Sequence, residues 1–313
     1  MKTRVLLIHD GAVDEFMSSL LLATMDDIEL VGVVIVAADC LGDTALQVQW
    51  KLHNFTGCLD VPATLSGARG LNPFPWPYRV DCVAQGQVPA LDRYGPNPAW
   101  PPFPDGDQFL REFFTTLTGR VTVLCLSPIT PLTDLLRAMP TAAAKIERLV
   151  WMAGAIAVSG NLDPSTLPVT VANPYAEWNV FWDPPAVDFL LRHTTIPITL
   201  FPLDVSNKAK VTAEFMNQLL VDGRQYPYAN LARQSYALVG NEPFYRLWDT
   251  TTTAWLARPD LFQPPRSMKL SVVLRSGSAG ALVASEDGRE VDVVMDFSNM
   301  PGFYDYLGQQ FRH

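Results

Sequence analysis

The sequence predicts one α/β domain over residues 1–313, in which helices flank a mostly parallel central sheet. Short runs rich in Val, Leu and Ile, typical of buried strands, alternate with segments whose apolar residues recur at helical spacing. This alternation persists to about residue 204. The length of 313 residues is enough for one large domain with a sizeable core, and we find no internal repeat, low-complexity tract or linker.

The first two thirds of the chain supply the alternating elements. An apolar run that ends before Asp10 predicts the first strand, and residues 16–25 predict the first helix. Residues 29–38 then predict a second strand, which Asp39 and Cys40 follow. The further elements expected here are helices at 43–55, 108–118, 127–136 and 187–193, and strands at 61–66, 121–126, 146–152 and 197–201.

The last third has a different pattern. Residues 212–256 are mainly helical, with an interruption around 240–243 and a last helical piece at 250–256. Residues 268–274 predict a further strand. Residues 282–285 and 290–295 alternate apolar and polar side chains, so that Asp287-Gly288 predicts a hairpin turn between them. A helix at 303–311 is expected to close the chain.

Residues 67–105 are rich in proline, glycine and aromatic side chains. So many prolines are incompatible with a regular helix or a central strand. The aromatic residues Phe74, Trp76, Tyr78 and Trp100 argue against disorder. Long irregular segments inside compact domains are commonly functional, so we expect this segment to be a binding loop.

Composition excludes several classes of protein. The net charge of −9, without clusters of Lys and Arg, argues against a nucleic-acid partner. The four cysteines show no C-x-x-C spacing, which indicates reduced thiols. No apolar run has the length of a signal-peptide core or of a membrane span, so no membrane association and a cytoplasmic location are expected.

Several carboxylates follow predicted strands or open predicted helices. They are Asp10, Asp14, Glu15, Asp39 and Asp249. In open α/β sheets, ligands bind beyond the carboxyl ends of the strands, so these side chains are expected to share a site. Such an oxygen-rich site suits Ca²⁺ or Mg²⁺, whereas no spacing of His or Cys suits zinc. Helix capping and the helix dipole would account for Asp14 and Glu15 without any site.

Two other enzyme classes fit less well. A nucleophilic Asp10 would suit a dehalogenase-type phosphatase, but the second aspartate expected two positions later is Ala12. The chain also lacks the G-x-S-x-G elbow of α/β serine hydrolases and the glycine motifs that cradle phosphates.

A series of motifs runs through most of the chain in a fixed order. It opens on Ile8-His9-Asp10-Gly11-Ala12-Val13-Asp14-Glu15. It continues with Asp39-Cys40, Asn72-Pro73-Phe74-Pro75, 126–130, 152–155, Gly160-Asn161, Ala176-Glu177-Trp178-Asn179, Trp182-Asp183-Pro184, Leu203-Asp204 and Trp248-Asp249. In this order the series resembles the inosine-uridine type nucleoside hydrolase superfamily, and more closely its purine-preferring (inosine-adenosine-guanosine) branch. That resemblance implies a Rossmann-like nucleoside hydrolase fold.

The resemblance also implies hydrolysis of an N-glycosidic bond, with the ribose held by Ca²⁺ at the bottom of a pocket. Carried over by position, Asp10, Glu15 and Asp249 would bind the metal through carboxylate oxygens, and Leu126 through its backbone carbonyl. Asp10 would also be the general base toward a water that the metal activates. The implied partner is a small nucleoside or a related glycoside, and the implied assembly is a homodimer or homotetramer.

The substrate-binding residues follow in the same way. Asp14, Asn161, Glu177 and Asn179 would bind the ribose hydroxyls, and Met152 would line the sugar site. No histidine lies beside Asp249, where pyrimidine-accepting members carry one, so Trp248 and either Trp76 or Tyr78 would stack on the base, near Asp39. As single residues, Trp248 could belong to the core, Trp76 and Tyr78 could pin a loop, and Asp39 could be a turn residue.

Three positions depart from the family pattern. Glu15 replaces an aspartate, and its extra methylene moves the carboxylate roughly 1 to 1.5 Å further from the backbone. Ile8 replaces an acid, and Ala12 replaces an asparagine of the purine-preferring branch. The alternative function is therefore a catalytically altered member that binds or hydrolyses another nucleoside-like or carbohydrate ligand.

Overall fold

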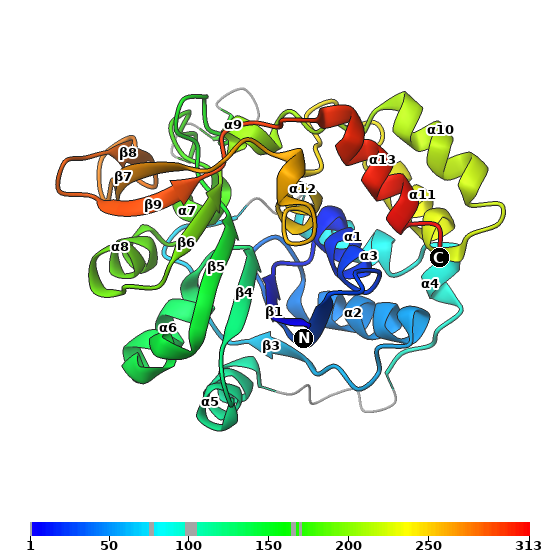
Figure 1. The fold of residues 1–313 in the computed structure, drawn as a ribbon, viewed down its shortest axis with the longest axis horizontal. Coiled ribbons are helices and arrows are strands. Elements are labelled where there is room, and N and C mark those ends of the chain that lie inside the picture. The colour runs from blue at the N-terminus through cyan, green and yellow to red at the C-terminus, as the bar shows by residue number, and fades with distance from the viewer. Residues whose placement is uncertain (1, 75–77, 98–104, 164–166, 169–170) are drawn as a thin grey trace.

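In the computed structural model, the chain folds into a nine-stranded sheet with helices on both faces (Figure 1). The structure describes residues 2–313 except 75–77, 98–104, 164–166 and 169–170. The strand order is β3-β2-β1-β4-β5-β6-β9-β7-β8. The predicted α/β class, with a mostly parallel sheet, is confirmed.

The six strands of the N-terminal two thirds are parallel to one another. The two central strands, β1 and β4, end in register, with His9 opposite Leu126. The residues that follow these strands therefore emerge at one edge of the sheet. The bounds are β1 (Thr3–His9), β2 (Ile28–Val36), β3 (Ala63–Ser66), β4 (Val121–Leu126), β5 (Ile146–Met152) and β6 (Ile198–Phe201).

The C-terminal strands are β7 (Arg266–Val272), β8 (Leu282–Ala284) and β9 (Arg289–Val293). Here the predicted hairpin between the last two strands is wrong, because β7 lies between them and is antiparallel to both. The turn at Gly288 passes so close to β7 that a Cβ there would lie 2.8 Å from the backbone of Leu270. A glycine at this turn thus lets the chain pass from one side of β7 to the other. There β9 pairs with β6 and buries Val291 and Val293.

Two apolar clusters cover the two faces of the sheet. Figure 1 shows one group of helices on each side. The first group is α1 (Val13–Leu22), α2 (Gly42–Thr56), α3 (Asp81–Gln85), α4 (Pro89–Asp92), α10 (Ala213–Asp222), α11 (Pro227–Leu238), α12 (Trp248–Ala254) and α13 (Met300–Gln310). The second group is α5 (Gly106–Thr116), α6 (Thr130–Ala138) and α8 (Pro184–His193).

Short elements complete the chain. They are α7 (Trp178–Phe181), α9 (Leu203–Ser206) and the 3₁₀ helices η1 (Tyr78–Val80), η2 (Pro140–Lys145) and η3 (Pro259–Leu261). Among the residues with described coordinates, no helix combines the length and the hydropathy needed to cross a bilayer.

Two details of the helices differ from expectation. The Pro-rich segment contains η1, α3 and α4, so the expected absence of regular helix there is wrong. Residues 81–85 contain no proline, and Pro89 occupies the first turn of α4, where its missing N–H costs no hydrogen bond. The helix expected from Ser127 begins instead at Thr130, with Pro131 in its first turn.

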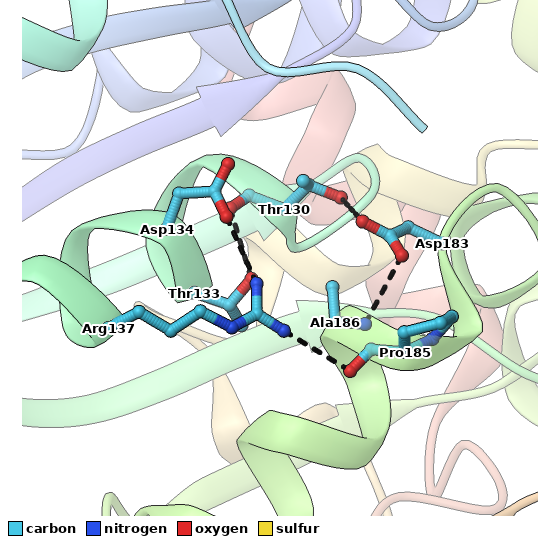
Figure 2. A network of polar contacts seen from close by, with 7 residues as sticks. All are labelled: Thr130, Thr133, Asp134, Arg137, Asp183, Pro185 and Ala186. Atoms are coloured by element: carbon cyan, nitrogen blue, oxygen red, sulfur yellow. Dashed lines mark hydrogen bonds and ion pairs between the residues drawn. The ribbon is translucent and has the colours of Figure 1, made fainter. Parts of the chain in front are cut away.

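A polar network joins α6 to the start of α8 (Figure 2). The Asp183 carboxylate caps α8 by accepting from the Ala186 N–H, and it also accepts from the Thr130 hydroxyl at 3.0 Å. Arg137 donates to Asp134 on its own helix and to the Pro185 carbonyl. Because α8 follows α7 after two residues, this network also anchors the segment that carries Glu177.

Candidate active site

A cavity of about 590 Å³ opens at the carboxyl ends of the parallel strands. Asp10 follows β1, Asp39 follows β2, and Leu126 and Met152 are the last residues of β4 and β5. The turn after β1 depends on Gly11, which has a φ of +78°, and a Cβ there would lie 2.8 Å from that of Ala45. The sheet thus brings together residues that are far apart in the sequence.

Most of the residues predicted for the site line this cavity. They are Asp10, Glu15, Asp39, Tyr78, Leu126, Met152, Asn161, Glu177, Asn179, Trp248 and Asp249. Asp14 is not among the lining residues. Trp76 lies outside the described residues, so its predicted stacking role stays a prediction.

Asp14 is fully buried in the first turn of α1, because this helix begins at Val13 and not at residue 16 as expected. Its Oδ1 accepts from the Tyr236 hydroxyl at 2.7 Å and from the Thr250 hydroxyl. Its Oδ2 accepts from the backbone N–H groups of Asp249 at 2.7 Å and of Thr250 at 2.9 Å. Asp14 therefore caps α12 and fixes the backbone of Asp249.

Asp10 and Glu15 are both buried, and each lies close enough to the other to affect its ionisation. Burial raises the pKa of both carboxyls, and the neighbouring charges of Asp39 and Asp10, respectively, raise them further. A cation bound beside the two carboxyls would offset this effect by stabilising their charged forms.

Asp249 lies in the first turn of α12 and is 6% exposed. Its Oδ1 is buried and accepts no hydrogen bond from any described residue. Burial, and then the charge of Glu15, raise the pKa of Asp249. An unpartnered carboxylate oxygen inside a cavity that other acids line suits a hard cation, which takes oxygen ligands.

The donor set nevertheless is not assembled into a complete metal site. Within the described ranges, no three side chains of His, Cys, Asp or Glu are gathered as metal ligands. Even so, Asp10, Glu15 and Asp249 line the same cavity. Binding of a cation by all three would require them to ionise, against the effect of burial on their pKa values.

Glu177 is the N-cap of α7 and joins it to the loop after β5. Its carboxylate accepts from the N–H groups of Gly154 at 2.8 Å, Asn179 at 2.8 Å and Val180 at 3.3 Å. The Asn179 amide donates in turn to the Met152 carbonyl at 3.0 Å. These contacts hold the predicted sugar-binding residues on one rigid frame.

The neighbouring loop is fixed in a similar way. The Asn161 side chain accepts from the Trp178 N–H at 3.2 Å. The Asp204 carboxylate accepts from the N–H groups of Ile156 at 2.9 Å and Ala157 at 2.8 Å. Asp204, which we noted only as part of the motif series, thus positions the loop that leads to Asn161.

The pKa of Glu177 gives a testable pH dependence of stability. Burial raises this pKa from 4.5 to about 7, although the three N–H donors oppose the shift. A raised carboxyl pKa in the folded state stabilises the protein fully below about pH 4.5, and this stabilisation is lost as the pH rises through about 7. Glu177→Gln should therefore gain stability relative to the wild type between those pH values, by roughly 3 kcal/mol.

Calorimetric unfolding of both proteins in chelator, at several pH values across this window, measures the difference. The wild type and the variant must be compared because burial also lowers the pKa values of His9 and His53, to about 3 and about 4. These histidines are present in both proteins and make stability fall as the pH is lowered, so their effect cancels in the difference. A difference in stability that does not change with pH would contradict the raised pKa of Glu177.

Aromatic side chains line the outer part of the cavity. Trp248 packs against Tyr245 with ring centroids 5.1 Å apart, and its Nε1 donates to Asn207 Oδ1 at 2.8 Å. Tyr78 meets Phe244 edge to face at 5.9 Å. Trp248 and Tyr78, predicted to stack on the base, therefore belong to a larger aromatic wall.

Sequence reasoning missed several lining residues of this wall and its surroundings. They include Phe74, Asp81, Asn207, Glu242, Phe244, Tyr245 and Arg246. The predicted interruption around 240–243 was a usable signal, because loops that a rigid scaffold positions often carry binding residues. Phe74 and Asp81 lie in the Pro-rich segment that was expected to be a binding loop, although no role was assigned to either side chain.

Comparison with known proteins agrees with this geometry. A crystal structure of an inosine-uridine preferring nucleoside hydrolase from Bacillus anthracis superposes with a TM-score of 0.89 and 32% identity, over 100% of this chain and 99% of that one. A purine-preferring ribonucleoside hydrolase from Gardnerella vaginalis shares the fold, with a TM-score of 0.82 at 16% identity, over 99% of this chain and 98% of that one.

The curated relatives match over a shorter stretch. A non-specific ribonucleoside hydrolase, RihC, of Salmonella paratyphi A is 28% identical over 180 residues, which is 58% of this chain and 55% of that protein. The family model for inosine-uridine preferring nucleoside hydrolases matches residues 5–305. This match includes the carboxyl ends of the parallel strands and every residue that lines the cavity, and the chain therefore belongs to the inosine-uridine preferring nucleoside hydrolase family.

Proposed function

We propose that this protein hydrolyses the N-glycosidic bond of ribonucleosides, with a preference for purines, in a Ca²⁺-dependent reaction. The observation that carries the proposal is the convergence of Asp10 and Asp249, with Leu126, in one cavity at the carboxyl ends of β1 and β4 and the start of α12. Membership of the family supports the reaction class.

Asp10, Glu15 and Asp249 would hold the cation through carboxylate oxygens, and Leu126 through its carbonyl. The cation would lower the pKa of a water and orient the ribose. Asp10 takes the proton from the attacking water. Glu177, Asn161 and Asn179 bind the sugar hydroxyls from their rigid frame, while Met152 packs against the sugar.

The charge of the cavity favours the transition state. Departure of the base leaves a sugar with oxocarbenium character, and the surrounding carboxylates stabilise this developing positive charge more than the neutral substrate. No histidine lines the cavity in the part of the chain that the structure describes. Stacking on Trp248 and Tyr78 is therefore the proposed means of polarising the leaving base, and it favours the larger purine ring.

Release of free base or reducing sugar from inosine, adenosine, guanosine, uridine and cytidine tests this proposal. With Ca²⁺ present we expect turnover, with kcat/KM for the purine nucleosides about ten-fold or more above that for uridine and cytidine. Chelation should abolish the activity, and added Ca²⁺ should restore it. Turnover that survives chelation would overturn the role of the cation, and equal rates for all five would overturn the purine preference.

A second candidate is a family member that binds a nucleoside or carbohydrate, or acts on another glycoside. The departures from the family pattern at Ile8, Ala12 and Glu15 favour it. If the folded, Ca²⁺-loaded protein releases base from none of the five nucleosides, the ribohydrolase proposal fails and this candidate stands.

A further inference from the structure

A second group of acids lines the cavity apart from the proposed cation ligands. Asp39, Asp81 and Glu242 belong to this group. In the described part of the chain, eight carboxylate side chains line the cavity and Arg246 is the one basic residue that does so. The proposed Ca²⁺ would account for three of those acids and would leave this second group uncompensated.

Two short segments build the outer end of the cavity, and each contributes one ring and one acid. The segment at η1 and α3 carries Tyr78 and Asp81, and the segment between α11 and α12 carries Glu242 and Phe244. The rings of Tyr78 and Phe244 touch at 5.9 Å, which brings the two segments together. Phe244 is 49% exposed, so this end faces the entrance.

The acids at this end act on one another. After burial, the charges of Glu15 and Asp81 raise the pKa of Asp39, and Asp81 likewise raises the pKa of Glu242 after burial. Asp39 Oδ1 is buried and has no hydrogen-bond partner within the described ranges. The carboxylates of these three partly buried acids therefore lie along one end of the cavity.

Basic groups nearby compensate only part of this charge. Arg79 lowers the pKa of Asp39, while its guanidinium also donates to the carbonyls of Cys40 and Ala37. Arg246 donates to the carbonyls of Asn207, Pro243 and Tyr245. Neither Asp81 nor Glu242 forms an ion pair with any residue whose placement is described.

We propose that Asp39, Asp81 and Glu242, together with the rings of Tyr78 and Phe244, select nucleosides whose base carries a positive charge. This inference rests on the proposed function, because it assigns the substrate class of the same site. Carboxylates and aromatic faces both attract a cation, and the attraction is stronger at partly buried groups than in bulk water. A ribosylated, N-alkylated purine or pyridinium ring has this chemistry.

Such a substrate also needs no general acid to protonate the leaving base. As the oxygen of water bonds to C1′, the bond from C1′ to the ring nitrogen breaks, and its electron pair neutralises the ring cation. The base leaves as a neutral molecule without accepting a proton, and the proton of the attacking water passes to Asp10. No histidine is needed for this departure.

The matched pair of 7-methylguanosine and guanosine tests the inference, since the two differ by one methyl group and one positive charge. Binding is measured by calorimetry at about pH 6 with Ca²⁺, on an Asp10→Asn background that prevents turnover. We expect the cationic nucleoside to bind about ten-fold or more tighter. Adding Asp81→Asn and Glu242→Gln should reduce this ratio to about three-fold or less.

Asp26→Asn with Glu286→Gln is the control, because it removes the same number of charges from exposed positions that do not line the cavity. It should leave the binding ratio unchanged. A parent ratio near one, or a ratio that survives Asp81→Asn and Glu242→Gln, would overturn the inference. If the wild type turns over no nucleoside yet the binding ratio behaves as expected, the hydrolase proposal fails and the charge selection stands.

Discussion

Asp10→Asn should lower kcat for nucleoside hydrolysis on the order of 1,000-fold or more, with little loss of folded stability. The substitution removes both the anion that accepts the proton of water and one charged oxygen proposed to hold the cation. Asn has nearly the same shape and volume as Asp, so the packing at the end of β1 should persist.

Single-turnover release of base from inosine measures the loss, and calorimetry verifies the fold. Asp26→Asn, the same chemical change on an exposed turn, should retain full activity. Residual activity of Asp10→Asn within ten-fold of the wild type would exclude Asp10 as the base. The activity would then have to be attributed to another carboxylate of the cavity. Asp249 is the first candidate, because it is the other aspartate proposed to hold the cation.

The positions of Asp10, Asp39, Leu126 and Met152 could be predicted from the sequence for a physical reason. Each lies at or just after the end of an apolar run, and parallel strands necessarily bring their carboxyl ends to one edge. The positions of the strand ends along the sequence therefore predict which distant residues meet in the folded protein. The same logic failed for the C-terminal hairpin, because a turn at Asp287-Gly288 does not reveal that β7 lies between its two arms.

The other parts of the site depend on contacts that no local pattern encodes. Glu242 and Phe244 reach the cavity only because their segment packs on Tyr78, more than 160 residues earlier. Likewise, the surroundings of Asp14 come from Tyr236, Asp249 and Thr250, which are 222 to 236 residues away. A first-turn acid near a motif is equally compatible with a ligand contact and with a buried cap.

Asp14→Ala should destabilise the protein strongly, because the structure makes Asp14 the acceptor for four buried donors. The hydroxyls of Tyr236 and Thr250 and the N–H groups of Asp249 and Thr250 would lose that acceptor. Each buried donor left without a partner costs about 1 to 3 kcal/mol. Allowing for local relaxation, we expect a loss of roughly 3 to 5 kcal/mol in the free energy of unfolding.

The size of this loss separates the two roles of Asp14. If its main partner were a ribose hydroxyl, as the resemblance implies, Asp14→Ala would raise KM and leave the unfolding of the ligand-free protein nearly unchanged. Asp43→Ala is the matched control, since Asp43 is also a first-turn acid but is exposed on α2, where the helix dipole accounts for about 1 kcal/mol or less. Urea unfolding of the wild type and both variants, in chelator, measures the difference. Equal stabilities of the two variants would favour the role of Asp14 in substrate binding. A loss of stability confined to Asp14→Ala would support its role in holding the backbone of Asp249.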